Sequence, residues 1–306
     1  MLAIVFAAGS AWWALVVIIF PLGLGSHAAI YASAAAAWIS GGDPWAVGPP
    51  TAVFAGPPPM LLPYLPFAAL PVDVTRITWF VGDLLVAAWA IRRLGLPAFW
   101  VAFPPFFEAI ILGHVEVLVL GLLVLRRPIS GLAVLIKPYA ALPLFAERRW
   151  RALIVAGVAG VVTFPFLPWA RFLSESASIT ATLARQDVGD SVFGNPLGIV
   201  VAVVALAALG WRRALWLATP VLWPYAQPLY KTMTIPLLVP VLALCWALPF
   251  AGATLTGIVI LAVLVTVNRS WPLPHWLRVG IGDQPTGGLL EQRMPPASAR
   301  PEAIQL

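Results

Sequence analysis

The sequence has little charge and few of the motifs that soluble catalysts carry. Only 10% of its 306 residues are charged, whereas soluble domains carry roughly 25%. Its one cysteine, Cys245, lies in an apolar run, so an internal disulfide is excluded. We find no phosphate-binding glycine loop, HExxH sequence or Cys/His cluster with zinc spacing. No Asp-x-Asp pair is present to hold a divalent metal against a nucleotide diphosphate. We therefore expect no metal and no cofactor, and an enzyme would need a membrane-delivered substrate.

What the chain has in abundance is apolar sequence, which makes up 61% of its residues. A membrane-spanning helix needs roughly 20 apolar residues, and such runs recur through residues 1–282. We expect an all-α polytopic membrane protein with about nine to ten transmembrane helices in one domain, residues 1–282. The first run lacks a basic leader and a clear cleavage site, which favours a retained span over a signal peptide. Residues 283–306 are rich in Pro, Ala and Arg, which predicts a disordered tail.

The expected spans are separated by two longer polar or irregular regions. Alanine-rich residues 27–40 predict an interfacial helix anchored by Tyr31 and Trp38. Six prolines within residues 57–71 predict a kinked helix at the surface. Residues 171–195 read as a polar loop on the same side. The spans themselves are expected near residues 2–24, 76–94, 97–112, 114–125, 151–169, 196–211, 214–230, 233–248 and 251–268.

Nine arginines in four groups set the orientation: 92–93, 126–127, 148–149–151 and 212–213. Arginines in short loops face the cytoplasm, so the net charge of +6 indicates orientation rather than nucleic-acid binding. All four groups reach the cytoplasm only if residues 128–146 enter and leave on one side. A single helix there would be about 28 Å long and could cross; a hairpin bent at Lys137-Pro138 would have arms of about 13 Å. The positions of the arginine groups favour the hairpin, whereas the length of the 128–146 segment favours a single span. The hairpin would place Lys137 at mid-membrane, facing a cavity.

Four stretches carry a family resemblance through their order and spacing. They are Tyr31 with Gly41-Gly42-Asp43-Pro44-Trp45; Pro57-Pro58-Pro59; Gly113-His114-Val115-Glu116; and Ile136-Lys137-Pro138-Tyr139 with Arg148-Arg149-Trp150-Arg151. In that order they resemble D-F-x-V-Y…G-G-D-P-Y, Y-P-P-L, G-Q-x-N, and L-K-x-Y-P with R-R-x-R of glycosyltransferase family 87. These are GT-C-fold enzymes related to polyprenol-phosphate-mannose-dependent mannosyltransferases. The resemblance covers about two-thirds of the chain.

The resemblance implies a GT-C-like bundle whose outer first loop carries juxtamembrane helices. It also implies a multi-pass protein of the bacterial plasma membrane. The expected reaction moves a hexose, mannose by resemblance, from a polyprenyl-phosphate donor to a glycolipid or cell-envelope glycan at the outer face. The expected partners are this donor, this acceptor and the lipid bilayer, and no nucleic acid.

The chain departs from the family pattern at positions that matter for catalysis. By the family's spacing, His27 stands where the resemblance places a catalytic aspartate. His114 and Glu116 replace the family's Gln and Asn. The base has become a histidine, another group serves, or the chain is inactive or differently specific. A histidine of ordinary pKa, about 6.5, predicts a pH profile that rises near about pH 6–7.

The candidate catalytic residues are His27 and Asp43, each with a structural alternative. His27 could be an interfacial residue without chemistry, and an aspartate before proline commonly forms a turn. Lys137 has no carboxylate nearby in sequence, so Glu116, Glu108 or Asp83 must pair with it, or it contacts substrate. The candidate substrate-binding residues are Tyr31, Arg76, His114, Glu116, Lys137 and Lys231.

Several of these residues have plainer explanations. Arg76 and Lys231 could pair with the donor phosphate or extend to the membrane interface. The tryptophans fit an aromatic belt without sugar stacking; these are Trp12, Trp13, Trp169, Trp223 and Trp271. Two other functions stay open. A transporter or flippase for a lipid or small polar solute would use Asp83, Glu108 and Lys137 as a pathway. An inactive relative would serve as a scaffold.

The missing metal motifs lead to a first prediction. Transfer should use a lipid-linked donor and should keep its full rate in excess chelator, measured with purified protein and a radiolabelled polyprenyl-phosphate sugar. Full activity with a nucleotide sugar alone, abolished by the chelator, would contradict this.

Overall fold

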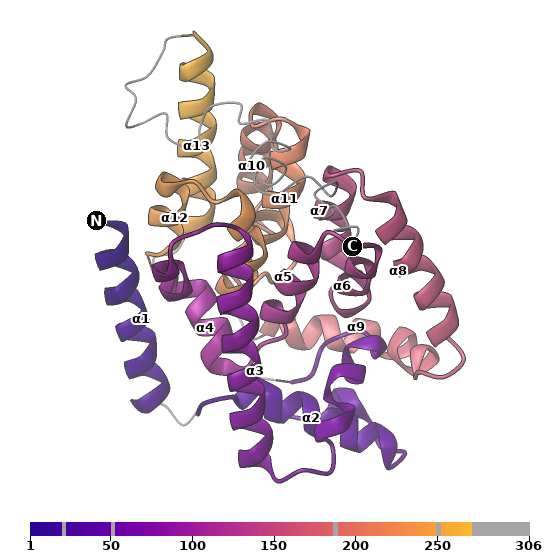
Figure 1. Cartoon of the computed structure of the whole chain (residues 1–306). Coiled ribbons are helices and arrows are strands. Elements are labelled where there is room, and N and C mark those ends of the chain that lie inside the picture. The colour runs from indigo at the N-terminus through magenta and orange to yellow at the C-terminus, as the bar shows by residue number, and fades with distance from the viewer. Residues whose placement is uncertain (20–22, 50–52, 186–188, 249–251, 271–306) are drawn as a thin grey trace, which may run out of the picture.

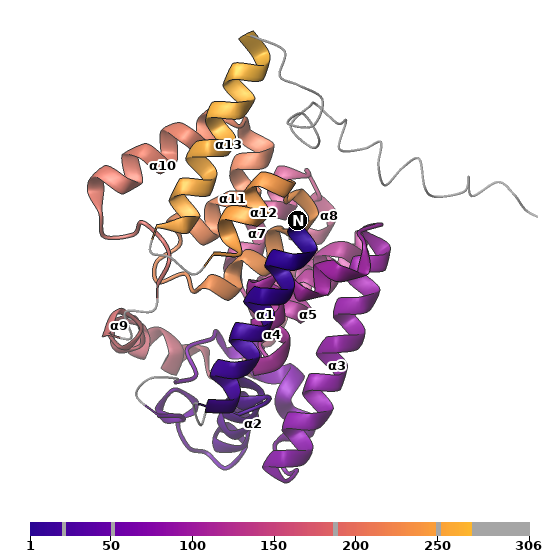
Figure 2. The same ribbon diagram turned by 90° about the vertical axis from the view of Figure 1, so that its left-hand side faces the viewer.

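The computed structural model describes residues 1–19, 23–49, 53–185, 189–248 and 252–270 (Figures 1 and 2). Within these ranges every regular element is a helix and no strand occurs, which confirms the all-α prediction. The predicted tail, residues 283–306, and Trp271 lie outside the described residues. In Figure 1 the first helix (indigo) and the last described helix (yellow) lie at the edge of the molecule, and many short helices lie between the long ones.

The first half of the chain contains the N-terminal helix, the first loop and three packed helices. These elements are α1 (Leu2–Ile19), α2 (Ser26–Ile39), η1 (Pro44–Ala46), η2 (Pro58–Phe67), α3 (Val72–Arg93), η3 (Ala98–Ala102), α4 (Pro104–Leu112) and α5 (Glu116–Leu125).

The second half begins with four short helices and ends in a long one. These elements are η4 (Pro128–Gly131), α6 (Leu132–Ile136), η5 (Pro138–Ala140), α7 (Ala141–Ala146), α8 (Trp150–Thr163), α9 (Trp169–Arg185), α10 (Pro196–Ala208), α11 (Trp211–Leu222), η6 (Pro228–Leu237), α12 (Pro240–Trp246) and α13 (Ala253–Ser270).

Helix α5 lies at the centre because it is apolar on all sides. Its Val117 and Leu120 belong to one hydrophobic core, shared with α1, α3, α4 and α10–α13. Its Val119 and Leu123 belong to a second core, shared with α2, η2 and the 128–146 segment. A helix without a polar face is stable only when it is buried. Glu116, the first residue of α5, is therefore carried into the interior and is 0% exposed.

Residues 128–146 form a hairpin, as the arginine pattern predicts. The backbone leaves the helical conformation at Lys137, between α6 and η5, because Pro138 disfavours it there. The two ends meet: the guanidinium of Arg149 donates to the carbonyl of Leu123 at 2.8 Å and to Ser130 Oγ at 2.6 Å. The alternative of a single span is excluded.

Several of the predicted membrane-spanning helices are shorter in the structure. Among the described residues α3, with 22 residues, is long and apolar enough to cross a membrane alone. Helices α4 and α5 would form a second membrane-spanning segment only if together they make one broken span, which is bent by 113°. Separate spans at 97–112 and 114–125 were expected, and this was wrong. Gly113 adopts a left-handed conformation that ends α4, and helices of 9 and 10 residues reach only about 14–15 Å.

The first outer loop, residues 26–74, is more buried than the sequence predicts. The predicted helix at 27–40 is confirmed as α2, but Tyr31 is 7% exposed and is not an interfacial anchor. The proline-rich stretch forms the 3₁₀ helix η2, whose Met60 and Tyr64 are buried. A surface location was expected there. Packing against α2 overrides it, because both elements contribute to the second core.

Glu147 joins three of the four arginine groups. Its carboxylate lies 3.7 Å from Arg126, 3.9 Å from Arg149 and 4.0 Å from Arg212. The fourth group ends α3. Figures 1 and 2 show α7 and α11 toward one end of the molecule and α2 and α9 toward the other. The arginine rule predicts that the α2–α9 end faces outward.

This arrangement predicts a labelling pattern in a Cys245→Ala background. Arg148→Cys should resist a membrane-impermeant maleimide in intact cells, because both flanks of the hairpin face inward. Ser178→Cys, on exposed α9, should be labelled and serves as the control. Outside labelling of Arg148→Cys would contradict the predicted orientation.

Candidate active site

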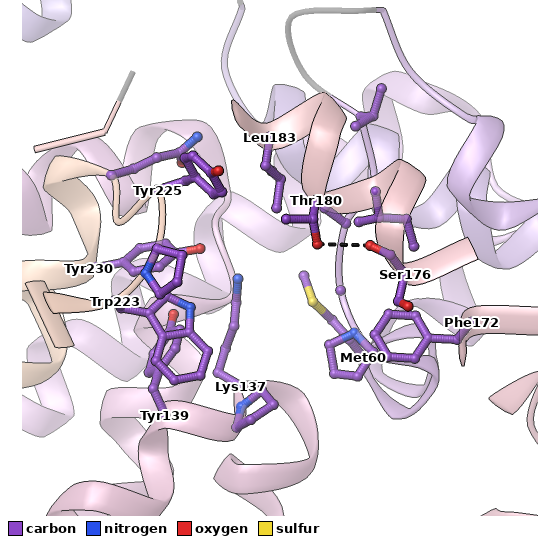
Figure 3. A pocket seen from close by; sticks show the side chains of 18 of the residues that line it. Met60, Lys137, Tyr139, Phe172, Ser176, Thr180, Leu183, Trp223, Tyr225 and Tyr230 are labelled. Atoms are coloured by element: carbon purple, nitrogen blue, oxygen red, sulfur yellow. Dashed lines mark hydrogen bonds between the residues drawn. The ribbon is translucent and has the colours of Figure 1, made fainter. Parts of the chain in front are cut away.

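A cavity of about 360 Å³ opens between the first outer loop, the hairpin and α9. Its walls combine apolar side chains with aromatic rings and a few polar groups, as ligand sites do. Figure 3 shows Lys137 standing between a wall of tyrosines and tryptophan and a wall formed by Met60 and α9. The polar and aromatic lining residues are His27, Tyr31, His114, Lys137, Tyr139, Trp169, Phe172, Ser176, Thr180, Trp223, Tyr225, Gln227 and Tyr230.

Two glycines bring His27 and His114 together. Gly25, just before α2, and Gly113, just after α4, both have φ 67°. The N–H of Gly25 donates to the carbonyl of Ile111 at 2.8 Å. A Cβ on Gly113 would lie 3.2 Å from Gly25 Cα and 3.0 Å from Ala28 Cβ. This close approach leaves the two imidazole centroids 5.0 Å apart.

Burial changes the chemistry of His27. Its ring is half-buried, the part that stays accessible faces the cavity, and its Nδ1 is buried without a hydrogen-bond partner. Loss of hydration, and secondly the positive charge of Lys137, lower the pKa of His27 to about 4. The sequence led us to expect an ordinary imidazole pKa, and this was wrong. A pKa of about 4 equals that of an ordinary aspartate, about 3.9.

His114 is held by the end of α4 and the start of α5. Its N–H donates to the carbonyl of Ala109 at 2.8 Å, closing the turn after α4. Its Nδ1 accepts from the backbone N–H of Glu116 at 3.4 Å. A neutral ring therefore carries its proton on Nε2. Tyr31 stacks edge-on against His114, with centroids 5.8 Å apart.

Lys137 is the cation of the cavity, and Glu116 is its partner. Lys137 is 8% exposed and Glu116 is 0% exposed, with Nζ 3.6 Å from Oε1. The hydroxyl of Tyr139 donates to the same carboxylate. The Lys137 ammonium also lies 5.1 Å from the ring centroid of Tyr230. The predicted ion pair of Lys137 is present, and Lys137 also lines the cavity; its contact with substrate stays a prediction.

One wall of the cavity is aromatic, which the sequence did not reveal. Tyr139 packs against Trp223 and Tyr230 with centroids 5.2 and 5.0 Å apart. Tyr225 beside them has φ 55°, a strained conformation for a tyrosine and one often found at functional sites. Trp223 and Trp169 were expected in an aromatic belt, but both line the cavity. No local pattern could have shown this, because distant segments build the wall.

Helix α9 replaces the expected polar loop and closes the cavity. Five of its residues face inward at helical spacing: Phe172, Ser176, Ile179, Thr180 and Leu183. That spacing was present in the sequence as an amphipathic pattern. Arg171 fastens the helix to the first loop, with Nη2 3.1 Å from Asp43 Oδ2 and Nη1 donating to the carbonyl of Gly42 at 3.4 Å.

Four candidate residues are not among those that line the cavity. One is Glu116, which pairs with the lining residue Lys137. Asp43 accepts from the N–H of Trp45 at 2.9 Å and pairs with Arg171. The first contact fits the structural alternative, an aspartate that forms a turn before proline. Arg76 lies 3.8 Å from Asp73. Lys231 forms a separate buried cluster in which Asp190 pairs with its ammonium and accepts from the hydroxyl of Thr254. Among the described residues, no group of three His, Cys, Asp or Glu is placed to hold a metal ion.

Comparison with known proteins assigns the family. The model of glycosyltransferase family 87 matches residues 54–270, more than half of the chain, so the chain belongs to this family. The match includes His114, Glu116 and Lys137, and it begins within the first outer loop, after His27 and Asp43. No curated protein and no solved structure matches the chain.

The buried pair leads to a stability prediction. Lys137→Met should destabilise the protein by about 3–5 kcal/mol, because it leaves the buried carboxylate of Glu116 unpaired. Lys137→Met with Glu116→Gln should be more stable than Lys137→Met alone, since the uncompensated charge is gone. Thermal unfolding in detergent measures both. If the Lys137→Met protein unfolds at the same temperature as the parent protein, the ion pair contributes nothing to stability.

Proposed function

We propose that this chain is an integral membrane hexosyltransferase that moves mannose from a polyprenyl-phosphate carrier to a glycolipid or cell-envelope glycan at the outer face of the bacterial plasma membrane. One observation carries the proposal. A candidate base, His27, and a buried cation, Lys137, come from distant segments and line the same aromatic cavity. The chain belongs to a glycosyltransferase family, which supports the reaction class.

Membrane insertion is supported by the exposed apolar faces. Large hydrophobic side chains project from α1, α3, α8, α10 and α13, including Ile77 at 58% exposure, Val161 at 75% and Val204 at 65%. Faces of this kind and extent mark contact with protein or lipid. We infer a GT-C-like bundle of membrane helices, several of them short or broken. Irregular backbone at membrane depth is tolerated where it lines a cavity.

The proposed reaction exchanges one bond at the anomeric carbon. An acceptor hydroxyl oxygen attacks C1 of the hexose, and the bond between C1 and the phosphate oxygen breaks. The electron pair of that bond leaves with polyprenyl phosphate. The hydroxyl proton passes to the imidazole of His27, which is neutral at pH 7 because its pKa is about 4.

Lys137 is placed to stabilise the departing phosphate. Its ammonium enters the cavity between the aromatic wall and α9 (Figure 3). Glu116 pairs with this ammonium, and Tyr139 donates to the Glu116 carboxylate, so the cation needs little reorganisation when charge develops on the phosphate. Donor binding would also offset the effect of Lys137 on His27 and raise the pKa of that histidine.

The remaining lining suits a sugar attached to a lipid. Tyr225, Trp223 and Tyr230 offer ring faces, and Gln227 offers an amide for sugar hydroxyls. Aliphatic residues elsewhere can receive the first isoprene units; they include Met60, Val134, Leu135, Ile179 and Leu183.

A transport function has less support. Such a function predicts a path through Asp83, Glu108 and Lys137. Asp83 and Glu108 are buried but are not lining residues of this cavity. The charge that acts on Glu108 is that of Lys231, which belongs to the separate cluster.

The direct test uses purified protein, radiolabelled polyprenyl-phosphate mannose and extracted envelope lipids. Label should pass into a glycolipid and release polyprenyl phosphate. Retention of all label on the donor, with each lipid extract and with each polyprenyl-phosphate hexose, would reject the transferase proposal.

The role of His27 yields a kinetic prediction. His27→Ala should lower turnover by about 10²–10⁴-fold, the usual contribution of a positioned base. His27→Asp should keep or restore activity, because a carboxylate at this position can also take the hydroxyl proton. Asp43→Asn is the control from the same loop, and it should retain turnover.

The pH profile separates a base from a structural role. Protonation of His27 should reduce kcat/KM as pH falls through about 4. The fall of kcat with decreasing pH should occur at a higher pH than the fall of kcat/KM, because bound donor phosphate favours the imidazolium form of His27. Full activity in His27→Ala would remove His27 as the base.

A further inference from the structure

The inward-facing end of the molecule holds a second hollow, open to the surface, with a volume of about 500 Å³. Its lining brings together the two ends of the hairpin and the first turn of α8. The hollow, which we call the arginine basin, is lined by Arg126, Arg127, Pro128, Arg148, Arg149, Trp150, Arg151 and Ala152. It lies outside the sugar-transfer cavity, with which it shares no lining residue.

The basin has more positive charge than the fold uses. Arg149 is structural, because it bonds Leu123, Ser130 and Glu147. Arg126 also pairs with the carboxylate of Glu147. Among the described residues, no other acid forms an ion pair with the five arginines of the basin.

Three arginines of the basin remain available to a ligand. Arg148 stacks over the ring of Trp211 at 5.7 Å and stays exposed. Arg127 and Arg151 are exposed, and within the part of the chain that the structure describes their guanidinium groups form no ion pair or hydrogen bond. Guanidinium groups that converge on an open hollow match the oxygens of a phosphodiester.

An apolar track leaves the basin along α8. Trp150 lines the basin and is 51% exposed, and Ile154 and Val158, each one turn further on, are 64% and 59% exposed. Residues four apart lie on the same face of a helix. A small free anion would use the arginines and leave this track uncovered, whereas a lipid would occupy both.

We propose that the arginine basin binds the phosphodiester headgroup of an anionic membrane lipid whose acyl chains lie along the Trp150–Ile154–Val158 face. Basic pockets on the cytoplasmic side of membrane helices recognise such headgroups by charge. The proposal relies on the membrane orientation inferred above and not on the sugar that is transferred.

The test is a binding titration of the purified full chain in neutral detergent. Fluorescent phosphatidylglycerol is the probe, and phosphatidylcholine with the same label and chains is the uncharged comparison. Phosphatidylglycerol should bind at least about tenfold more tightly. Each arginine near a membrane surface contributes about fivefold, so Arg127→Gln with Arg151→Gln should weaken binding about 25-fold.

A matched pair distinguishes the basin from general positive charge. Arg92→Gln with Arg93→Gln removes the same charge from another exposed arginine group, at the end of α3, and should change affinity less than about twofold. Equal losses in both pairs would overturn the proposal, as would equal binding of the two lipids by the parent. Displacement by sn-glycerol 3-phosphate at concentrations similar to the lipid would show a headgroup-only anion site and would also overturn it.

Discussion

The buried ion pair between Lys137 and Glu116 is the constraint on which the rest of the site depends. A lone charge in a protein interior costs several kcal/mol, so each of these groups requires the other. Glu116 begins α5, the helix shared by both cores, and Lys137 stands at the bend of the hairpin. Pairing therefore fixes the bend of the hairpin against the centre of the fold. It also leaves the ammonium at the edge of the cavity, where it can meet a phosphate.

The site is composite, and short contacts hold its parts together. Gly25 and Gly113 let α2 approach the α4–α5 break, which places His27 beside His114. At the opposite wall, Arg171 fastens α9 to the first outer loop. The base candidate, the cation and the covering helix thus come from three separate segments. Because each contact joins a different pair of segments, the cavity exists only in the folded chain.

The sequence predicted those features that follow from local charge and turn chemistry. The arginine groups and Pro138 predicted the hairpin, and the lack of a nearby carboxylate predicted a distant partner for Lys137. The breaks at Gly113 and the burial of Tyr31 were missed, because tertiary packing decides them. The aromatic wall was missed for the same reason. The pKa of His27 depends on burial and on the charge of Lys137, and neither can be read from residues near His27 in sequence.

The most direct measurement of the central claim is photo-crosslinking of a polyprenyl-phosphate mannose that carries a diazirine next to the phosphate. The account predicts attachment to cavity residues, in peptides containing Met60, Lys137 or Thr180. Unlabelled donor should abolish the attachment. Attachment that donor displaces but that maps only to the cluster around Lys231, or only to the arginine basin, would contradict the assignment of the cavity as the site of sugar transfer.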